Sequence, residues 1–191
     1  MLPFITLIGS GLISVAVGAY GLLDQQRKSQ QLASLEAQIR EAAIDTFMLP
    51  QASEQFLDSL IRTIDRARGE VIVLAYVLTH KQIIQALRRA AKRRVAVYVV
   101  VDGSHNTAKH LSEMLKSTGI TLIQDQQPGR KMHLKAVLID KRVLYAGSAN
   151  LSRAGIGQNI EAVFKVTDQA VIKHFIQECI QTWGYLKPKS A

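Results

Sequence analysis

Apolar positions in the first half of the chain change between helical and extended spacing. Residues 52–68 carry apolar side chains three and four positions apart, as one face of an amphipathic helix requires, and Gly69 ends that helix. The apolar run of residues 71–76 is typical of a strand buried on both faces. The alternation continues with a helix over 81–93, a strand over 95–101, a helix over 108–117 and a strand over 120–123. This order predicts parallel crossover units in a layered α/β domain.

Strands dominate the second half of the chain. Residues 132–140 and 143–146 have the composition of two strands separated by a tight turn, which predicts a hairpin, and residues 160–166 form a further strand. Asp168 is placed to cap a closing helix that runs to about Trp183. The sequence therefore predicts an α/β fold in which a mixed central β-sheet is flanked by helices on both faces.

The first 23 residues contain no charged side chain, and roughly 20 apolar residues are enough for a helix to cross a bilayer. We expect an uncleaved membrane anchor, in a bacterial inner membrane, because a signal peptide would have a basic start and a shorter apolar core. A cleaved signal with Val17-x-Ala19 as its cleavage site, giving a periplasmic or secreted product, is the alternative. A buried core helix is the third. Arg27 and Lys28 favour a cytoplasmic side for the rest of the chain.

Residues 24–47 are polar and favour a helix. Leu32, Leu35, Ile39 and Ala42 are spaced three, four and three positions apart, which suits either a short coiled-coil stalk or a solvated linker helix. Pro50 breaks this pattern. We therefore place a catalytic domain at residues 48–191.

Basic residues are concentrated in that domain. The chain has 24 Lys and Arg against 15 Asp and Glu. The first 47 residues hold three of the basic and four of the acidic groups. Residues 48–191 therefore carry 21 basic and 11 acidic groups, a net charge of +10. Such a charge favours a polyanionic partner, either nucleic acid or anionic phospholipid. Cys179, the single cysteine, excludes an intrachain disulfide and lies in an apolar helical run, so we expect a core residue.

The candidate chemistry lies between His133 and Asn150. Strand alternation would put His133 and Lys135 on one face, where two cationic groups are costly unless an anion lies between them. Ser148 and Asn150 are also two positions apart, after Gly147, which permits tight backbone geometry. An imidazole, an ammonium, a hydroxyl and an amide can together bind and attack a phosphate. The other histidines lack such a pattern and are interpreted as ordinary surface or core residues: His80, His105, His110 and His174.

The spacing His-x-Lys, four residues, Asp, six residues, Gly-Ser-x-Asn resembles the signature of the phospholipase D superfamily. The resemblance covers about residues 50–185 and leaves out the first 47. Within it, Asn159-x-Glu161, residues 75–79 and Trp183 are similar to a small single-motif branch, which includes bacterial periplasmic and plasmid endonucleases and a mitochondrial cardiolipin hydrolase. The chain matches the signature at each fixed position: His133, Lys135, Asp140, Gly147, Ser148 and Asn150.

The resemblance implies a metal-independent phosphodiesterase without a cofactor. His133 would attack phosphorus to form a phosphohistidine, and a second histidine would protonate the leaving group. A chain with one motif would obtain that histidine from a second copy, in a homodimer with a shared site. The remaining roles implied by the family are phosphate binding for Lys135, Ser148 and Asn150, orientation of the histidine for Glu161, and a structural role for Asp140. The charge of Lys135 also disfavours a metal ion beside His133.

Further cationic residues flank the signature. Arg130 and Lys131 precede His133 in a Gly- and Pro-containing loop, and Arg153 follows Asn150, so all three are candidates for substrate binding. The cluster at residues 88–94 is better explained as a solvated helix face. An endonuclease acting on DNA or RNA is the leading hypothesis, and a phospholipase D acting on membrane phospholipids such as cardiolipin is the alternative. A catalytically silent binding module is the third, which the complete signature disfavours.

Overall fold

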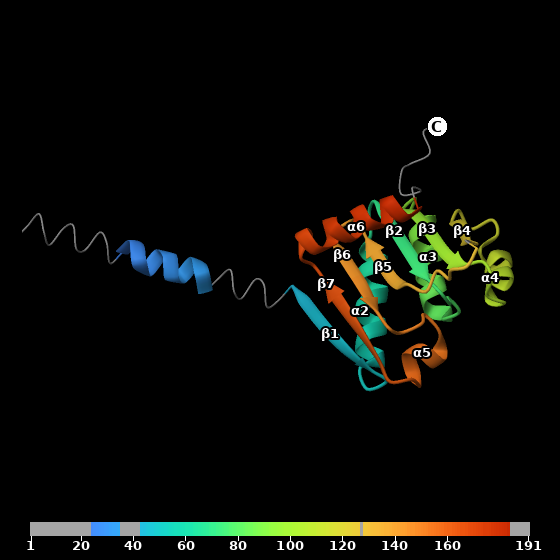
Figure 1. Ribbon diagram of the computed structural model, residues 1–191, viewed down its shortest axis with the longest axis horizontal. Helices are drawn as coiled ribbons and strands as arrows, with labels where there is room; N and C mark the ends of the chain where they lie inside the picture. Colours follow the sequence, from blue (N-terminus) through green and yellow to red (C-terminus); the bar gives the residue numbers. More distant parts are fainter. Residues whose placement is uncertain (1–23, 35–42, 127, 184–191) are drawn as a thin grey trace, which may run out of the picture. The chain divides into compact units, whose positions relative to one another are not determined.

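The chain divides into two compact units, Met1–Ala42 and Ala43–Ala191. The structure, a computed structural model, describes residues 24–34, 43–126 and 128–183. Residues 24–34 form a helix, and the second unit holds a seven-stranded sheet with helices on both faces (Figure 1). The membrane anchor expected at residues 1–23 lies outside the described residues. None of the described helices has both the length and the apolar character needed to span a membrane.

The sheet has the strand order β1-β7-β6-β5-β2-β3-β4. Its strands are β1 (Ile44–Leu49), β2 (Glu70–Ala75), β3 (Ala96–Asp102), β4 (Thr121–Asp125), β5 (Lys135–Ile139), β6 (Val143–Gly147) and β7 (Glu161–Val166). The helices of this unit are α2 (Ser53–Arg66), α3 (Lys81–Lys92), α4 (Thr107–Leu115), α5 (Arg153–Gly157) and α6 (Gln169–Trp183).

The sheet is mixed, as predicted. β2, β3 and β4 are parallel, whereas β5 joins β2 antiparallel and the remaining pairs are antiparallel. The carboxyl ends of β2, β3 and β6 therefore lie beside the amino ends of β5 and β7, at one end of the strands. We call this end of the sheet the site edge, because it brings the His-x-Lys and Gly-Ser-x-Asn parts of the signature together.

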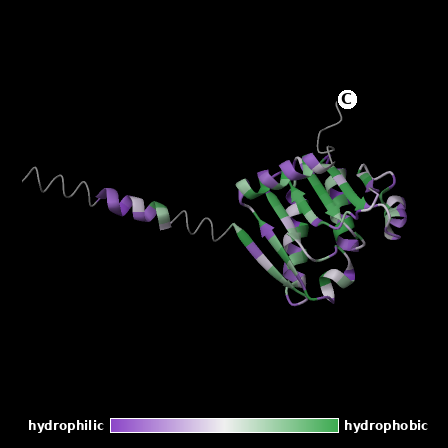
Figure 2. Ribbon diagram, in the orientation of Figure 1, coloured by the Kyte–Doolittle hydropathy of each residue, from purple (hydrophilic) through white to green (hydrophobic). Residues whose placement is uncertain are grey.

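Apolar side chains form a core on each face of the sheet. Phe56 and Leu60 of α2 and Leu87 of α3 pack with one core, and Ile172 and Cys179 of α6 belong to the other. The central strands are hydrophobic along their length (Figure 2), as expected for strands covered on both faces. Cys179 is buried, which confirms its predicted place in the core.

The closing helix starts as the sequence predicts. The carboxylate of Asp168 accepts hydrogen bonds from the backbone N–H groups of Ala170 (2.8 Å) and Val171 (3.1 Å). These bonds satisfy donors that the first turn of α6 would otherwise leave unpaired.

The helical stalk predicted over residues 24–47 is wrong for its last part. Ile44 to Phe47 lie in β1, an edge strand that pairs with all six residues of β7. Phe47 packs on Phe56 with ring centroids 5.7 Å apart, and Leu49 is fully buried. The branched side chains of Ile44 and Thr46 favour a strand. The domain therefore begins with β1 rather than at residue 48.

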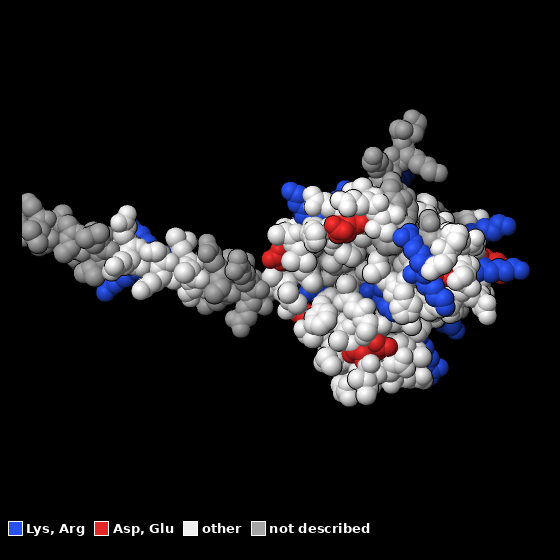
Figure 3. Space-filling model, viewed as in Figure 1, with Lys and Arg blue, Asp and Glu red and all other residues white. Residues whose placement is uncertain are grey.

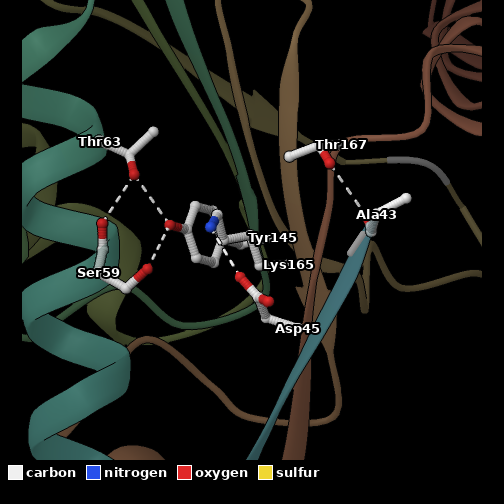
Figure 4. A network of polar contacts seen from close by, with 7 residues as sticks. All are labelled: Ala43, Asp45, Ser59, Thr63, Tyr145, Lys165 and Thr167. Carbon is white, nitrogen blue, oxygen red and sulfur yellow. Dashed lines mark hydrogen bonds and ion pairs between the residues drawn. The ribbon is translucent and has the colours of Figure 1, made fainter. Parts of the chain in front are cut away.

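Tyr145 of β6 connects the sheet to α2. Its hydroxyl lies 2.8 Å from the Ser59 hydroxyl and 2.9 Å from the Thr63 hydroxyl, so the polar end of this buried ring is hydrogen-bonded (Figure 4). In the same region Lys165 of β7 pairs with Asp45 of β1 at 2.7 Å. The Tyr145 contacts hold β6 against α2 two residues before Gly147, where the Gly-Ser-x-Asn part of the signature begins.

Candidate active site

Lys135 and His133 meet at the start of β5. The Lys135 side chain is 9% exposed, and its Nζ lies 2.8 Å from His133 Nδ1 and 3.2 Å from Nε2. The ammonium also donates to the His133 backbone carbonyl at 2.7 Å. The His133 side chain itself is exposed. A buried cation is thus held against an imidazole that solvent and ligands can reach.

His133 is not in the strand predicted over residues 132–140, because β5 begins only at Lys135. The Met132 N–H donates to the Asp102 carboxylate at 2.9 Å instead of to a neighbouring strand, which ends the ladder early. Tyr76 still donates its N–H to the Leu134 carbonyl at 2.9 Å. His133 and Lys135 therefore meet through a loop and not through the pleat of a strand.

Burial makes the charge of Lys135 costly. Desolvation lowers the pKa of Lys135, and the negative charge of Glu161 partly opposes that shift. Glu161 is half-buried at the start of β7 and accepts a hydrogen bond from the Asn159 amide at 3.3 Å. A phosphate anion bound beside Lys135 would provide the missing compensation.

Tyr76 forms an aromatic platform beneath these groups. Its ring centroid lies 4.5 Å from that of His133 and 4.9 Å from that of His105. Lys135 Nζ lies 5.3 Å and Lys131 Nζ 6.0 Å from the centroid, within the range of a cation–π contact. Sequence reasoning missed the roles of Tyr76 and His105. The available signal was the position of Tyr76 directly after a buried strand.

Asp102 holds the loop that carries His133. It is 2% exposed and accepts hydrogen bonds from the Ser104 backbone N–H (2.9 Å), the Ser104 hydroxyl and the Met132 N–H. Burial alone would raise the pKa of Asp102, but these hydrogen bonds outweigh it and the pKa is lowered. The residue is charged at neutral pH and fixes the backbone next to His133. Sequence reasoning did not identify this role.

The Gly-Ser-x-Asn part of the signature lies beside the start of β7. Ser148 donates its N–H to the Ala162 carbonyl at 3.0 Å and accepts the Ala162 N–H on its hydroxyl at 3.1 Å. A Cβ on Gly147 would lie 2.1 Å from the Ala162 carbonyl oxygen, so only glycine permits this approach. Asn150 Oδ1 is buried without a hydrogen-bond partner among the described residues.

Asp140 lies at the other end of β5, away from His133. Its carboxylate accepts the backbone N–H groups of Arg68 (3.0 Å), Gly69 (2.8 Å) and Glu70 (2.9 Å). Its φ of +51° is tolerated by aspartate better than by most residues. Burial would raise the pKa of Asp140, but the three N–H donors hold it below its usual value. Asp140 therefore stabilises the turn before β2, consistent with the structural role expected of it.

The three candidate substrate-binding residues lie in different places. Arg130 and Lys131 line a cavity of about 330 Å³ together with His133. Arg153 is exposed at the start of α5, a short helix that the sequence pattern did not reveal, and it does not line this cavity. On the face seen in Figure 3, Lys and Arg side chains gather toward β3, β4 and α4.

The predicted site is thus only partly assembled within one chain. His133, Lys135 and Lys131 are together, and Glu161 acts on Lys135 by its charge, but the described residues show no hydrogen bond between Glu161 and the His133 ring. Among the residues described, no three His, Cys, Asp or Glu side chains are grouped as metal ligands would be. The larger cavities lie away from His133.

A family profile described as "Cardiolipin synthase, PLD-like domain" matches residues 60–183. Human mitochondrial cardiolipin hydrolase is 29% identical over 167 residues, which cover 83% of this chain and 66% of that protein, slightly less than two thirds of its length. A phospholipase D of Rickettsia conorii is 27% identical over 190 residues, covering 91% of this chain and 92% of that one.

Two solved structures share the fold. NucT from Helicobacter pylori superposes with a TM-score of 0.63 at 27% identity, over 72% of this chain and 95% of that one. Nuc from Salmonella typhimurium, described as a phospholipase D family member, gives a TM-score of 0.64 at 23% identity, over 74% of this chain and 93% of its own. The second likeness concerns the fold alone.

Proposed function

Because the chain belongs to the PLD-like domain family, we propose that it is a metal-independent phosphodiesterase in which His133 attacks phosphorus. The observation that carries this proposal is the buried Lys135 ammonium, 2.8 Å from a ring nitrogen of the exposed His133. A neutral imidazole is a nucleophile, and a cation beside it stabilises the negative charge that builds on the non-bridging oxygens.

The reaction proceeds in two displacements. A His133 nitrogen forms a bond to phosphorus while the bond to the leaving oxygen breaks, and a second histidine gives that oxygen its proton. Water then attacks the phosphohistidine, the second histidine takes a proton from the water, and the P–N bond breaks. Lys135, Asn150 and Ser148 bind the phosphate oxygens during both steps, and Glu161 orients a histidine ring.

The second histidine is the His133 of another copy in a homodimer. One feature of the site edge supports this arrangement. Apolar side chains are exposed there, with Leu134 at 38% and Ile160 at 86%, next to His133 and Glu161. A twofold contact would cover them.

We propose that the substrate is nucleic acid, cut internally as DNA or RNA. Arg130 and Lys131 lie in the cavity with His133 and can bind the phosphates next to the scissile one, with Arg153 as a more distant contact. The net charge of +10 over residues 48–191 attracts such a polyanion.

A phospholipase D acting on membrane phospholipids such as cardiolipin is the second candidate. Its support is the uncharged segment of residues 1–23, which we propose to be a membrane anchor. The resemblance to a cardiolipin hydrolase is compatible with either substrate.

The deciding experiment uses the full chain in detergent with EDTA present. Single-stranded DNA, duplex DNA, RNA and cardiolipin vesicles are offered to the wild type and to His133→Ala, with the exposed His174→Ala as the matched control. We expect nucleic-acid cleavage that resists EDTA, falls roughly 10⁴-fold or more in His133→Ala and is unchanged in His174→Ala. Hydrolysis of lipid alone would refute the nuclease, and loss of all activity in EDTA would refute the metal-free mechanism.

A further inference from the structure

The edge of the sheet opposite the site edge is strongly basic. α2 ends there before β2 starts, α3 ends there before β3 starts, and the hairpin between β5 and β6 turns there. We call this surface the basic end and define it by six exposed cations: Arg66, Arg68, Lys92, Arg94, Lys141 and Arg142.

The acidic groups near the basic end are already engaged. Asp65 pairs with Arg89 at 2.8 Å and with Arg93 at 3.8 Å, and Asp140 is occupied by three backbone N–H groups. Glu70 lies 3.4 Å from Lys141. The other five cations of the basic end form no ion pair within 4.0 Å among the described residues. Their charge is therefore largely available to an anionic partner.

Two cavities open at the basic end and share Arg68. One, of about 760 Å³, is lined by the apolar Ile72 and Tyr98, by the cations Arg68, Lys141 and Arg142, and by the carboxylates Glu70 and Asp140. The other, of about 680 Å³, is lined by Arg66 and Arg68 with Arg93. Cations at the mouth of a cavity with partly apolar walls suit an amphiphile that has an anionic headgroup and apolar chains.

The direction of β1 relates this surface to the amino-terminal segment. Ile44 pairs with Val166 and Leu49 pairs with Glu161, so β1 starts at the basic end and runs toward the site edge. Thr167 fixes that start by donating its N–H to the Ala43 carbonyl at 2.8 Å and its hydroxyl to the same oxygen at 3.3 Å. Figure 4 shows the bond from the hydroxyl. Only residues 24–42 separate Ala43 from the apolar residues 1–23. A tether this short gives the basic end a high effective concentration at a membrane that holds the segment.

We propose that the basic end binds the anionic phospholipid surface of the membrane that holds residues 1–23. The inference rests on the anchor of the proposed function and not on its chemistry. The six residues of β2 separate the two edges by roughly 20 Å, so docking directs His133 away from the bilayer. Phospholipids of that leaflet are then out of reach of the site, and the substrate is a phosphodiester dissolved in water, such as nucleic acid.

Hydrogen exchange of the full chain in lipid nanodiscs tests the docking. Discs of phosphatidylcholine alone are compared with discs containing about 30% phosphatidylglycerol, which gives a surface charge of physiological order. We expect slower exchange at residues 92–96 and 139–143 in the anionic discs only, and loss of this protection in 1 M salt. Exchange at residues 130–135, on the site edge, should be the same in both discs.

A pair of double variants separates local charge from net charge. Arg68→Gln with Arg142→Gln removes two cations of the basic end, and Lys81→Gln with Lys109→Gln removes two exposed cations elsewhere. Since each cation near an anionic surface contributes roughly a factor of five, the first pair should weaken docking about 25-fold and the second should leave it unchanged.

Equal protection in neutral and anionic discs, or an equal effect of both pairs, would overturn the proposal. Protection of the basic end that appears only when DNA or RNA is added would assign this surface to nucleic acid instead. Phosphodiester hydrolysis measured in the same discs keeps the two proposals apart. Docking without hydrolysis refutes the chemistry alone, and hydrolysis without docking refutes this inference alone.

Discussion

Lys135 keeps an ammonium largely out of water with only partial compensation by Glu161. Since burial lowers the pKa of Lys135, the folded state binds this proton less tightly than the unfolded chain does, and the charged form is a cost at neutral pH. A bound phosphate removes the cost. The residue that we propose to stabilise the transition state is therefore a source of instability in the empty site.

Replacement of this cation separates activity from stability. Lys135→Met should lower the hydrolysis rate roughly 10²–10³-fold, because a charge at the non-bridging oxygens is lost. The free energy of unfolding should not fall, since a desolvated charge is exchanged for an apolar side chain of similar length. Hydrolysis rates measure the first effect, and thermal unfolding with and without inorganic phosphate measures the second. A lower melting temperature without phosphate would show that Lys135 stabilises the empty fold.

Asp140 should control the stability of the domain in acid. Its pKa is lowered in the folded protein, so its contribution is present above the unfolded pKa near 3.8 and is lost as the pH falls through the folded pKa. Asp140→Asn should lower the free energy of unfolding at pH 7 by roughly 2–3 kcal/mol and flatten its dependence on pH below about 4, because the charged acceptor is gone. Denaturant unfolding between pH 2 and 7 measures this.

Asparagine keeps the tolerance for positive φ that position 140 requires, so Asp140→Asn isolates the loss of charge. Asp140→Ala removes the acceptor and that tolerance together and should be the less stable variant. Identical pH profiles for the wild type and Asp140→Asn would contradict the assigned role.

Among the elements, β1 has the clearest consequence for the fold. It closes the antiparallel edge of the sheet, and Phe47 and Leu49 contribute to the core on the α2 face. A chain starting at residue 48 would lack most of the six pairs with β7 and the Phe47–Phe56 contact.

The boundary of the catalytic unit can be tested directly. A fragment of residues 43–191 should unfold cooperatively. A fragment of residues 48–191 should be less stable by roughly 1–3 kcal/mol, because it loses the partly buried Phe47 and most of the pairs with β7. Urea unfolding followed by circular dichroism compares the two. Equal midpoints would mean that β1 contributes nothing to the domain.

Elements with strong local patterns were predictable from the sequence. α2 and α3 follow the spacing of their apolar residues to within two positions at each end, and the mixed sheet follows from the change in element order. β1 was missed because its partner, β7, lies more than 100 residues later. The early end of β5 depends on Asp102, which reaches Met132 from another strand. α5 spans five residues, too few to show a period.

His133 and Lys135 of the signature lie together as expected, but they meet in a different way. The contact of His133 with Lys135 was expected from strand alternation and is made through a loop. The contacts of Tyr76 and Asp102 were not predicted, because they depend on which strand ends lie side by side. A sequence without its fold does not specify that arrangement.

For the whole molecule, activity should depend on dimerisation. Ile160→Glu changes a side chain that is 86% exposed in the single chain and should leave folding intact. In a dimer formed at the site edge it would place like charges near the twofold axis, raise the dissociation constant roughly 100-fold and reduce activity in parallel. Sedimentation velocity and hydrolysis rates over a range of protein concentrations measure this.

Val171→Glu is the matched control, since Val171 is 48% exposed near the start of α6, away from the site edge. It should alter neither association nor hydrolysis. A fully active species that sediments as a monomer would refute the shared site.

The single cysteine of the chain should be unreactive toward thiol-labelling reagents. Cys179 is buried in α6, and burial, aided by the charge of Glu178, raises the pKa of its thiol to about 11. At neutral pH the sulfur is protonated and shielded, so maleimides and spin-label reagents will react with an introduced surface cysteine first. Paired spin labels on an otherwise native chain can therefore measure distances across the proposed twofold axis and from each edge of the sheet to the bilayer.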